Sequence, residues 1–318
     1  MATRDGTSRA VFLFLTLVLQ PALASIFSTS YVDLCQPDPQ TGNSLTKLTT
    51  NTFYTMSYVQ SLDLSKNDIS GIDDYAFDDL YGLQWLILSR NKIRNISAEV
   101  FYDLSALVHL DLSFNDISYI NPAALKSLGK VEHLYLQYNP LKTLAGWSPE
   151  SVPKATFLNL ESTGLSSLPP EIFEGRDLRD LILARNEFQS LPSPALNKLG
   201  GNLVSLDISD NHFKRIEAGA LQNCSGLKWL KISNNEKLQS IEKDAFKGLG
   251  SLKTLILQYN RRLSHLHPNA FGADKPNLQT LLLRQNKLKY LQFNFVNWGA
   301  LRIADLQDNP WNCDCHLK

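Results

Sequence analysis

Cysteine and histidine side chains, which can ligate metals or form disulfides, come together in the segment NPWNCDCHLK, residues 309–318. Cys313, Cys315 and His316 are possible zinc ligands, but a zinc site of this kind needs two such pairs or a distant histidine pair. Two cysteines one residue apart cannot easily bridge each other, because the backbone between them is too short for disulfide geometry. We therefore predict no metal site here, and we expect the partners of both cysteines to lie elsewhere.

Carboxylates are the other side chains whose placement could support catalysis, because paired carboxylates can act as general acid and base. Four aspartates recur in the same place of similar segments, but LDLS is the ordinary form of a repeated motif, so they carry little information. No phosphate-binding loop or nucleophile elbow is present, and nothing around Cys224 suggests a nucleophile. We therefore predict that the protein is not an enzyme and has no catalytic residues and no cofactor. The four aspartates are Asp63, Asp111, Asp207 and Asp305.

One motif, Leu-x-Leu-x-x-Asn with close variants, dominates the sequence. Successive copies lie 23 to 26 residues apart, and Thr163 fills the asparagine position of one copy. A further unit in front, from Asn43 to Val59, keeps the same apolar offsets. We therefore predict about twelve repeats over residues 43–308. The asparagines of the motif are Asn67, Asn91, Asn115, Asn139, Asn186, Asn211, Asn235, Asn260, Asn286 and Asn309.

Each Leu-x-Leu segment predicts a short strand whose two leucines point to one side. Because connections of this length return every strand to the same place, the strands must stack in parallel, and the leucines form a core that no single repeat could bury alone. An asparagine at the strand end can donate to and accept from the backbone of neighbouring turns, whereas a threonine can do only part of this. Phenylalanines on the far side predict a stacked spine. They are Phe53, Phe77, Phe101, Phe173, Phe246 and Phe271.

With these motifs, the sequence resembles leucine-rich repeat proteins over residues 43–318. The resemblance implies an α/β fold, a solenoid or horseshoe with a parallel β-sheet on the concave face. The convex side is expected to be mostly irregular or short-helical.

The beginning of the chain has the features of a secretory signal peptide. A short polar stretch with two arginines precedes the apolar run AVFLFLTLVL, which is too short to span a bilayer, and Ala22-Leu23-Ala24 suits a signal peptidase. We predict a signal peptide over residues 1–24, cleavage before Ser25 and a short N-terminal cap segment over residues 25–42. The product is expected to be secreted or extracellular.

Charge and glycosylation motifs agree with an extracellular location. The chain has 31 basic and 31 acidic residues, which gives no electrostatic reason to expect nucleic acid or an anionic membrane as partner. No second apolar stretch could cross a membrane, so no membrane insertion is expected. The triplets Asn95-Ile96-Ser97 and Asn223-Cys224-Ser225 predict N-glycosylation at Asn95 and Asn223.

The segment NPWNCDC resembles the C-terminal disulfide cap of extracellular leucine-rich repeat proteins, including Toll-like and Slit-like receptors. In that family each of the two cysteines pairs with a cysteine further downstream, so the resemblance implies that the partners of Cys313 and Cys315 are missing. Residues 309–318 are then the start of a truncated cap, and a downstream anchor would place the protein at the cell surface. Cys224 replaces an apolar residue of the repeat and is predicted to be a buried thiol. Cys35 precedes the first repeat, and its partner is left open.

The informative positions of the sheet are those where its outward residues depart from the repeat pattern. Adjacent repeats place Trp85, His109, His133, Tyr135 and Phe157 in neighbouring columns of the concave face. Exposed aromatic clusters serve as anchors of protein interfaces, so we predict that these five residues bind a ligand. The histidine pair could also hold a metal, but a pair without a third close ligand is a poor site.

The segment after Asn139 breaks the repeat pattern in the same region. It contains Pro140, Pro149 and Pro153, and Trp147 stands in place of the spine phenylalanine. We expect an irregular loop here rather than a helical turn.

Together these features predict a secreted or cell-surface recognition module that binds a protein or glycan on its concave face. By resemblance, receptor, adhesion and innate-immunity families come first. The first alternative is an extracellular-matrix protein of the small leucine-rich proteoglycan type, although such proteins usually carry a four-cysteine N-terminal cluster and lack the NPWNCDC cap. The second alternative, an enzyme, would need a converging polar pocket that the sequence does not indicate.

Overall fold

A computed structural model describes residues 45–273 and 275–312 of the chain. The expected signal peptide, the N-terminal cap segment and Cys35 lie outside the described residues. Cys313 and Cys315 lie outside them as well, so the expectation of a truncated cap stays a prediction.

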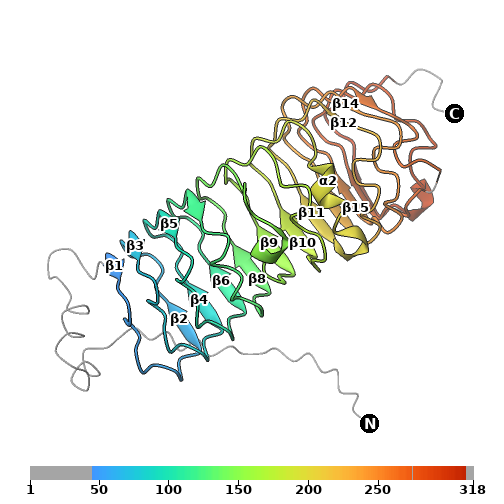
Figure 1. Cartoon of the computed structure of the whole chain (residues 1–318). Coiled ribbons are helices and arrows are strands. Elements are labelled where there is room, and N and C mark those ends of the chain that lie inside the picture. Colours follow the sequence, from blue (N-terminus) through green and yellow to red (C-terminus); the bar gives the residue numbers. More distant parts are fainter. Residues whose placement is uncertain (1–44, 274, 313–318) are drawn as a thin grey trace, which may run out of the picture.

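Eleven strands of three residues each form one long parallel sheet, which runs the length of the stack (Figure 1). In most of these strands the middle residue is buried and its two neighbours face outward, as the Leu-x-Leu pattern predicts. The strands are β2 (Ser61–Asp63), β4 (Trp85–Ile87), β6 (His109–Asp111), β8 (His133–Tyr135), β9 (Phe157–Asn159), β10 (Asp180–Ile182), β11 (Ser205–Asp207), β13 (Trp229–Lys231), β15 (Thr254–Ile256), β17 (Thr280–Leu282) and β18 (Ile303–Asp305).

The rest of each coil contains only short elements, so the expected solenoid with an irregular or short-helical far side is confirmed. Two-residue strands pair across neighbouring coils: β1 (Lys47–Leu48) with β3 (Gly71–Ile72), β5 (Asn95–Ile96) with β7 (Tyr119–Ile120), β12 (Arg215–Ile216) with β14 (Ser240–Ile241), and β14 with β16 (His265–Leu266). The helices within the described part of the chain are η2 (Pro149–Ser151), α2 (Ser193–Leu196), η3 (Gly200–Asn202) and η4 (Trp298–Ala300). The predicted front unit is present through β1, whereas any long-sheet strand of that unit lies outside the described residues.

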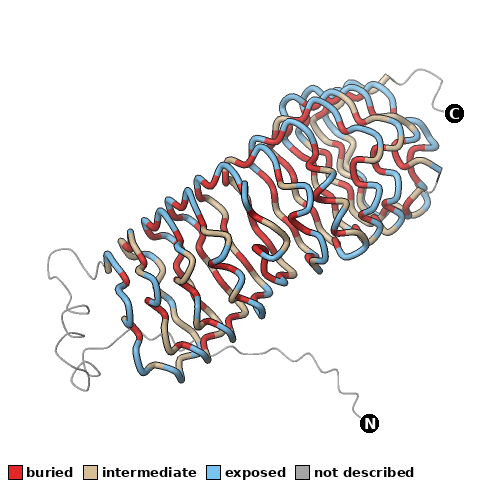
Figure 2. The backbone as a smooth tube through the Cα atoms, viewed as in Figure 1, coloured by how far each residue is buried: buried red, intermediate tan, exposed pale blue. Residues whose placement is uncertain are grey.

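Leucines and phenylalanines fill the inside of the stack as one continuous core. Buried residues, red in Figure 2, recur along the successive coils. The phenylalanine spine is observed: ring centroids are 5.7 Å apart between Phe53 and Phe77 and 6.2 Å apart between Phe77 and Phe101. Cys224 is fully buried, as predicted, and burial raises the pKa of its thiol to about 12. The thiol therefore belongs to the packing of the core.

The motif asparagines form a ladder that joins the coils. Asn115 is typical: its Nδ2 donates to the carbonyl oxygens of Leu88 and Leu112 at 2.9 and 3.0 Å, and its Oδ1 accepts from the Ile93 N–H at 3.1 Å. One buried amide thus satisfies backbone groups of its own coil and of the preceding one.

Thr163 interrupts this ladder, as the sequence predicts. Its Oγ1 lies 2.8 Å from the Leu160 carbonyl oxygen and 3.0 Å from Oδ1 of Asn186, but no hydrogen bond from its side chain to the preceding coil is observed. The Leu141 N–H, whose equivalents in earlier coils donate to the next asparagine, donates instead to the Asn139 carbonyl at 2.9 Å.

The expectation of an entirely irregular segment after Asn139 was wrong in one respect. Residues Pro149–Ser151 form the 3-10 helix η2. Proline is tolerated at the first position of a helical turn, because its missing N–H has no partner there in any case. Trp147 is buried, with 8% of its surface exposed, so it packs into the core as the sequence suggests.

Candidate ligand-binding site

Four of the five predicted ligand-binding residues form one cluster of rings on the outer face of β6, β8 and β9. The ring centroid of Tyr135 lies 4.9 Å from that of His109 and 4.9 Å from that of Phe157. His133 completes the cluster at 6.0 Å from His109 and 6.1 Å from Phe157. All four side chains are partly exposed. We call His109, His133, Tyr135 and Phe157 the ring cluster.

Trp85, the fifth predicted residue, lies one strand before the ring cluster. The parallel register of β4 and β6 pairs Trp85 with His109. Its side chain is also partly exposed, on the same face. The sheet therefore presents five successive aromatic or imidazole side chains over four neighbouring strands, an area that suits a protein surface with matching apolar side chains.

Burial shifts the pKa values of two residues of the ring cluster, His109 and Tyr135. Desolvation lowers the pKa of His109, the nearby Asp111 carboxylate opposes this effect, and His133 adds to it. Desolvation also raises the pKa of Tyr135, with a smaller contribution from Asp111. At neutral pH the fold therefore favours a neutral imidazole at position 109 and a neutral phenol at position 135. Both forms suit contact with apolar or hydrogen-bonding groups of a ligand.

The repeated aspartates of the sheet have a structural task. The Oδ1 atom of Asp63 accepts from the Ser65 N–H at 2.9 Å, and Asp111 and Asp207 make the same contact with the residue two positions later, at 2.9 and 3.0 Å. Asn159 makes it in β9, at 2.9 Å. These side chains close the turn at the end of their own strands, which explains why they recur.

A second aromatic row lies along the edge of the sheet where the strands end. The residue before each ladder position has positive φ, for example 54° at Phe114 and 58° at Tyr138. The rings of these two residues are stacked, with centroids 4.4 Å apart, and the Arg90 guanidinium lies 4.5 Å from the Phe114 centroid. The Arg185 guanidinium donates to the Tyr138 hydroxyl at 3.2 Å. The sequence showed both aromatics but not their stacking, because the left-handed backbone conformation sets their direction.

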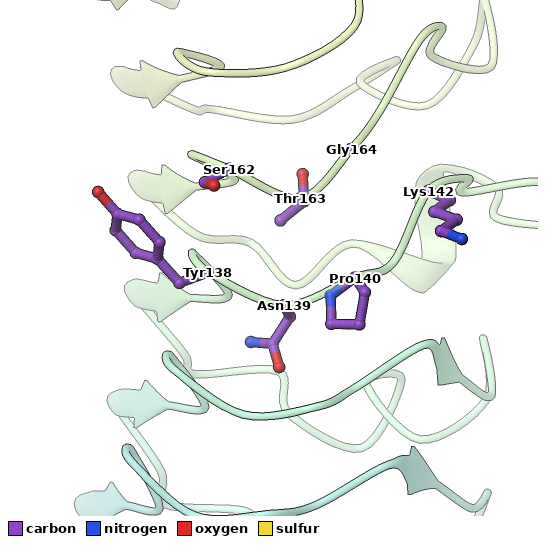
Figure 3. A pocket seen from close by; sticks show the side chains of 7 residues that line it. All are labelled: Tyr138, Asn139, Pro140, Lys142, Ser162, Thr163 and Gly164. Carbon is purple, nitrogen blue, oxygen red and sulfur yellow. The ribbon is translucent and has the colours of Figure 1, made fainter.

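A shallow pocket of about 360 Å³ opens beside this row, where the asparagine ladder is interrupted (Figure 3). It lies between residues 138–142 of one coil and residues 162–164 of the next. Thr163 is shorter than asparagine, and its side chain makes no hydrogen bond to the coil before it. The two coils are therefore less tightly joined at this point. The sequence showed the Asn-to-Thr exchange but did not predict a pocket.

Both predicted glycosylation sites are exposed and lie outside the long sheet. Asn95 belongs to β5, a strand of a separate two-stranded sheet, and Asn223 lies in a turn before β13. Within residues 45–273 and 275–312, no group of three or more histidine, cysteine, aspartate or glutamate side chains could hold a metal ion. Among the helices of the same residues, none is long and apolar enough to cross a membrane.

Solved structures with a fold similar to this chain include a leucine-rich repeat domain, a TLR13 complex and a Toll complex. The leucine-rich repeat domain of APL1B is 24% identical with a TM-score of 0.67, and the match covers 85% of this chain and 75% of that one. A chain of the TLR13–ssRNA13 complex is 22% identical with a TM-score of 0.56, and the match covers 86% of this chain and 50% of that one. A chain of the Drosophila Toll–Spatzle complex is 19% identical with a TM-score of 0.67, covering 86% and 41%.

These likenesses concern the fold, and the chain spans half or less of the length of the latter two proteins. A search of curated proteins finds no match. The family of leucine rich repeats, by contrast, matches residues 41–93, 82–141 and 201–261, which together make up about half of the chain. With the eleven-stranded parallel sheet and the asparagine ladder, this match shows that the chain belongs to the leucine-rich repeat family.

Proposed function

We propose that the protein is an extracellular recognition module that binds a protein ligand through the ring cluster and Trp85, and that it has no catalytic role. The observation that carries the proposal is the packing of four partly exposed rings around Tyr135, with centroids 4.9 to 6.1 Å apart. Aromatic side chains held rigidly by their neighbours lose little conformational entropy on binding, which is why such residues dominate interfaces.

The chemistry of this face favours a protein over a nucleic acid. The outward residues of β4, β6, β8 and β9 include no lysine or arginine, so the face offers no cation to a phosphate backbone. Related shapes occur in complexes with either class: the TLR13 structure is a complex with ssRNA13 and the Toll structure a complex with Spatzle. For this chain, the aromatic surface without lysine or arginine supports the protein class.

The extracellular part of the proposal rests on the signal-peptide sequence and on the two exposed glycosylation triplets. Asn95 and Asn223 both lie off the long sheet, so sugars attached there would leave the ring cluster accessible. Similar folds in receptor-type proteins are consistent with this location.

A binding screen with matched variants tests the proposed function. Arrays of purified extracellular proteins and of glycans are probed with the full chain and with the Tyr135→Ala and Phe157→Ala variants. Ser205→Ala, on the same face in a later repeat, serves as the control. We expect protein ligands that the two ring variants lose and the control retains. Ligands retained by both ring variants but lost by Ser205→Ala would place the site on other repeats, and binding to glycans alone would overturn the protein class.

A further inference from the structure

A row of basic side chains lies along the edge of the sheet where the later strands begin. Each residue of this row donates its N–H to the carbonyl oxygen of the equivalent residue one coil earlier, at 2.8 Å in every step from residue 179 to residue 302. The coils are therefore stacked in register at this edge. The row consists of Arg179, Val204, Lys228, Lys253, Gln279 and Arg302.

Among the residues that the structure describes, no carboxylate is paired with any of the four cations of this row. Within the described residues, none of these side chains takes part in an ion pair or a side-chain hydrogen bond, whereas Lys231 on the neighbouring sheet surface is paired with Asp207 at 2.9 Å. Asp180, the residue after Arg179, is the acidic side chain nearest to the row in sequence. The earlier repeats have no cation at the equivalent positions, which are occupied by Gln60, Gln84, Val108, Glu132 and Thr156. The basic row is thus a local property of the later repeats.

An apolar floor borders the basic row on the sheet surface. The strand register places Thr254 between Trp229 and Thr280, and it aligns Ile256 with Leu282. Ile303 ends the floor with 56% of its surface exposed. The long sheet therefore offers a second apolar area, separated from the ring cluster by β10 and β11. We call Trp229, Thr254, Ile256, Thr280, Leu282 and Ile303 the aliphatic floor. Two charged side chains flank it on the same strands: Lys231, which is paired with Asp207, aligns with Ile256, and Asp305 aligns with Leu282.

We propose that the basic row and the aliphatic floor together bind an extended protein segment in which acidic and apolar side chains alternate. The basic row crosses six coils, which at roughly 4.8 Å per strand spans about 24 Å, the length of about seven extended residues. Successive side chains of an extended segment point to opposite sides, so one side can meet the cations while the other covers the floor. The basic row and the aliphatic floor therefore select a partner with one row of acidic and one row of apolar side chains.

The aliphatic floor favours a peptide over other polyanions as the partner of this surface. A sulfated glycan or a single-stranded nucleic acid could neutralise the cations, but it would leave Ile256, Leu282 and Ile303 in contact with polar groups or water. Burial of these aliphatic side chains is favourable only against apolar groups. This surface is independent of the ring cluster, so the proposal goes beyond the proposed function and does not depend on it.

The test uses the full chain and defined probes. The main probe is a fluorescent peptide in which glutamate alternates with leucine, and the comparison probes are an all-glutamate peptide, a lysine–leucine peptide, a heparin oligosaccharide and a single-stranded RNA. We expect the glutamate–leucine peptide to bind most tightly, and we expect its affinity to fall as salt screens the charges. Lys228→Ala/Lys253→Ala should reduce its affinity about fivefold, since each exposed pair contributes modestly.

Matched variants distinguish binding at this surface from non-specific attraction to positive charge elsewhere on the protein. Lys243→Ala/Lys247→Ala removes two exposed lysines from a turn outside the sheet and should leave binding unchanged. Ile256→Ser should weaken the binding of the glutamate–leucine peptide and leave the binding of the all-glutamate peptide unchanged. Tyr135→Ala should change the binding of neither peptide. Thermal unfolding confirms that each variant is folded. Binding that is insensitive to the Lys228 and Lys253 substitutions overturns the proposal, as does heparin or RNA that binds as tightly as the peptide.

Discussion

Tyr135 packs against rings from both neighbouring strands, although neither ring belongs to its register partner. The register pairs Tyr135 with Asp111 and Asn159, yet its ring lies 4.9 Å from those of His109 and Phe157. The side chain thus leans across the row formed by His109, His133 and Phe157. This diagonal packing makes Tyr135 the centre of the ring cluster.

The first prediction concerns Tyr135 and Phe157 as anchors. Replacing either with alanine is expected to weaken binding of a protein ligand by about 2 kcal/mol, as for a typical interface anchor. Both side chains point away from the leucine core, so the free energy of unfolding should fall only by the ring contacts, about 1 kcal/mol or less. Titration calorimetry and urea unfolding measure the two effects. A loss of stability larger than the loss of binding energy would indicate a structural role.

The second prediction is a dependence of stability on pH that originates at His109. Because burial lowers its pKa, the unfolded chain binds a proton more readily than the folded protein. The contribution of His109 to the free energy of unfolding is therefore complete above about pH 6.5, the ordinary pKa of histidine. It is lost as the pH falls through that value towards the lower pKa that His109 has in the folded protein.

Urea unfolding of matched variants between about pH 7.5 and about pH 5 tests this dependence. His109→Gln should lose less stability on acidification than wild type. Asp111→Asn should lose more, because the carboxylate that opposes the shift is gone. The asparagine can still close the strand-end turn, as Asn159 does. Equal acid sensitivity of wild type and His109→Gln would show that this histidine does not control the profile.

The third prediction concerns the interrupted asparagine ladder. Thr163→Asn should restore a donor to the Leu136 carbonyl and an acceptor for the Leu141 N–H, raising the free energy of unfolding by about 1 kcal/mol. Asn139→Ala should lower it by about 3 kcal/mol or more, because Asn139 donates to Leu112 and Leu136 and accepts from Ile117. Chemical denaturation measures both. A destabilised Thr163→Asn variant would mean that the two coils cannot accommodate the longer side chain at this position.

The fourth prediction is that Cys224 is unreactive in the folded protein. Its thiol is fully buried, and its pKa is raised to about 12, so the thiolate is rare at neutral pH. Iodoacetamide should therefore label Cys224 only after denaturation, which peptide mass mapping distinguishes from labelling of other cysteines. Rapid labelling without denaturant would show that the coil around Cys224 opens locally.

The fifth prediction concerns the sugars. Mass spectrometry of the secreted protein should find glycans at Asn95 and Asn223, because both side chains are exposed. Asn95→Gln and Asn223→Gln should leave binding through the ring cluster unchanged, since neither site belongs to the long sheet. An unoccupied site refutes the first part of this prediction, and a ligand whose binding depends on either sugar refutes the second.

Most of the fold could be predicted from the sequence, because its determinants are local and repeated. Alternation in each strand decides that Leu110 and Leu134 face inward and that His109 and His133 face outward. A nearly constant spacing then fixes the register, since a slip of one residue would expose the whole leucine row. The asparagine ladder and the exception at Thr163 follow from the same repetition, as does the burial of Cys224.

The tertiary structure decided how side chains meet within these columns. The diagonal contacts of Tyr135, the stacking of Phe114 on Tyr138 and the pocket beside Thr163 all depend on rotamers and on left-handed backbone positions. These choices are set by neighbours one coil away, which lie about two dozen residues apart in the chain. The sequence determined which residues share a face of the sheet. Only the stacked coils decided which of them touch, because side-chain packing minimises energy over all neighbours at once.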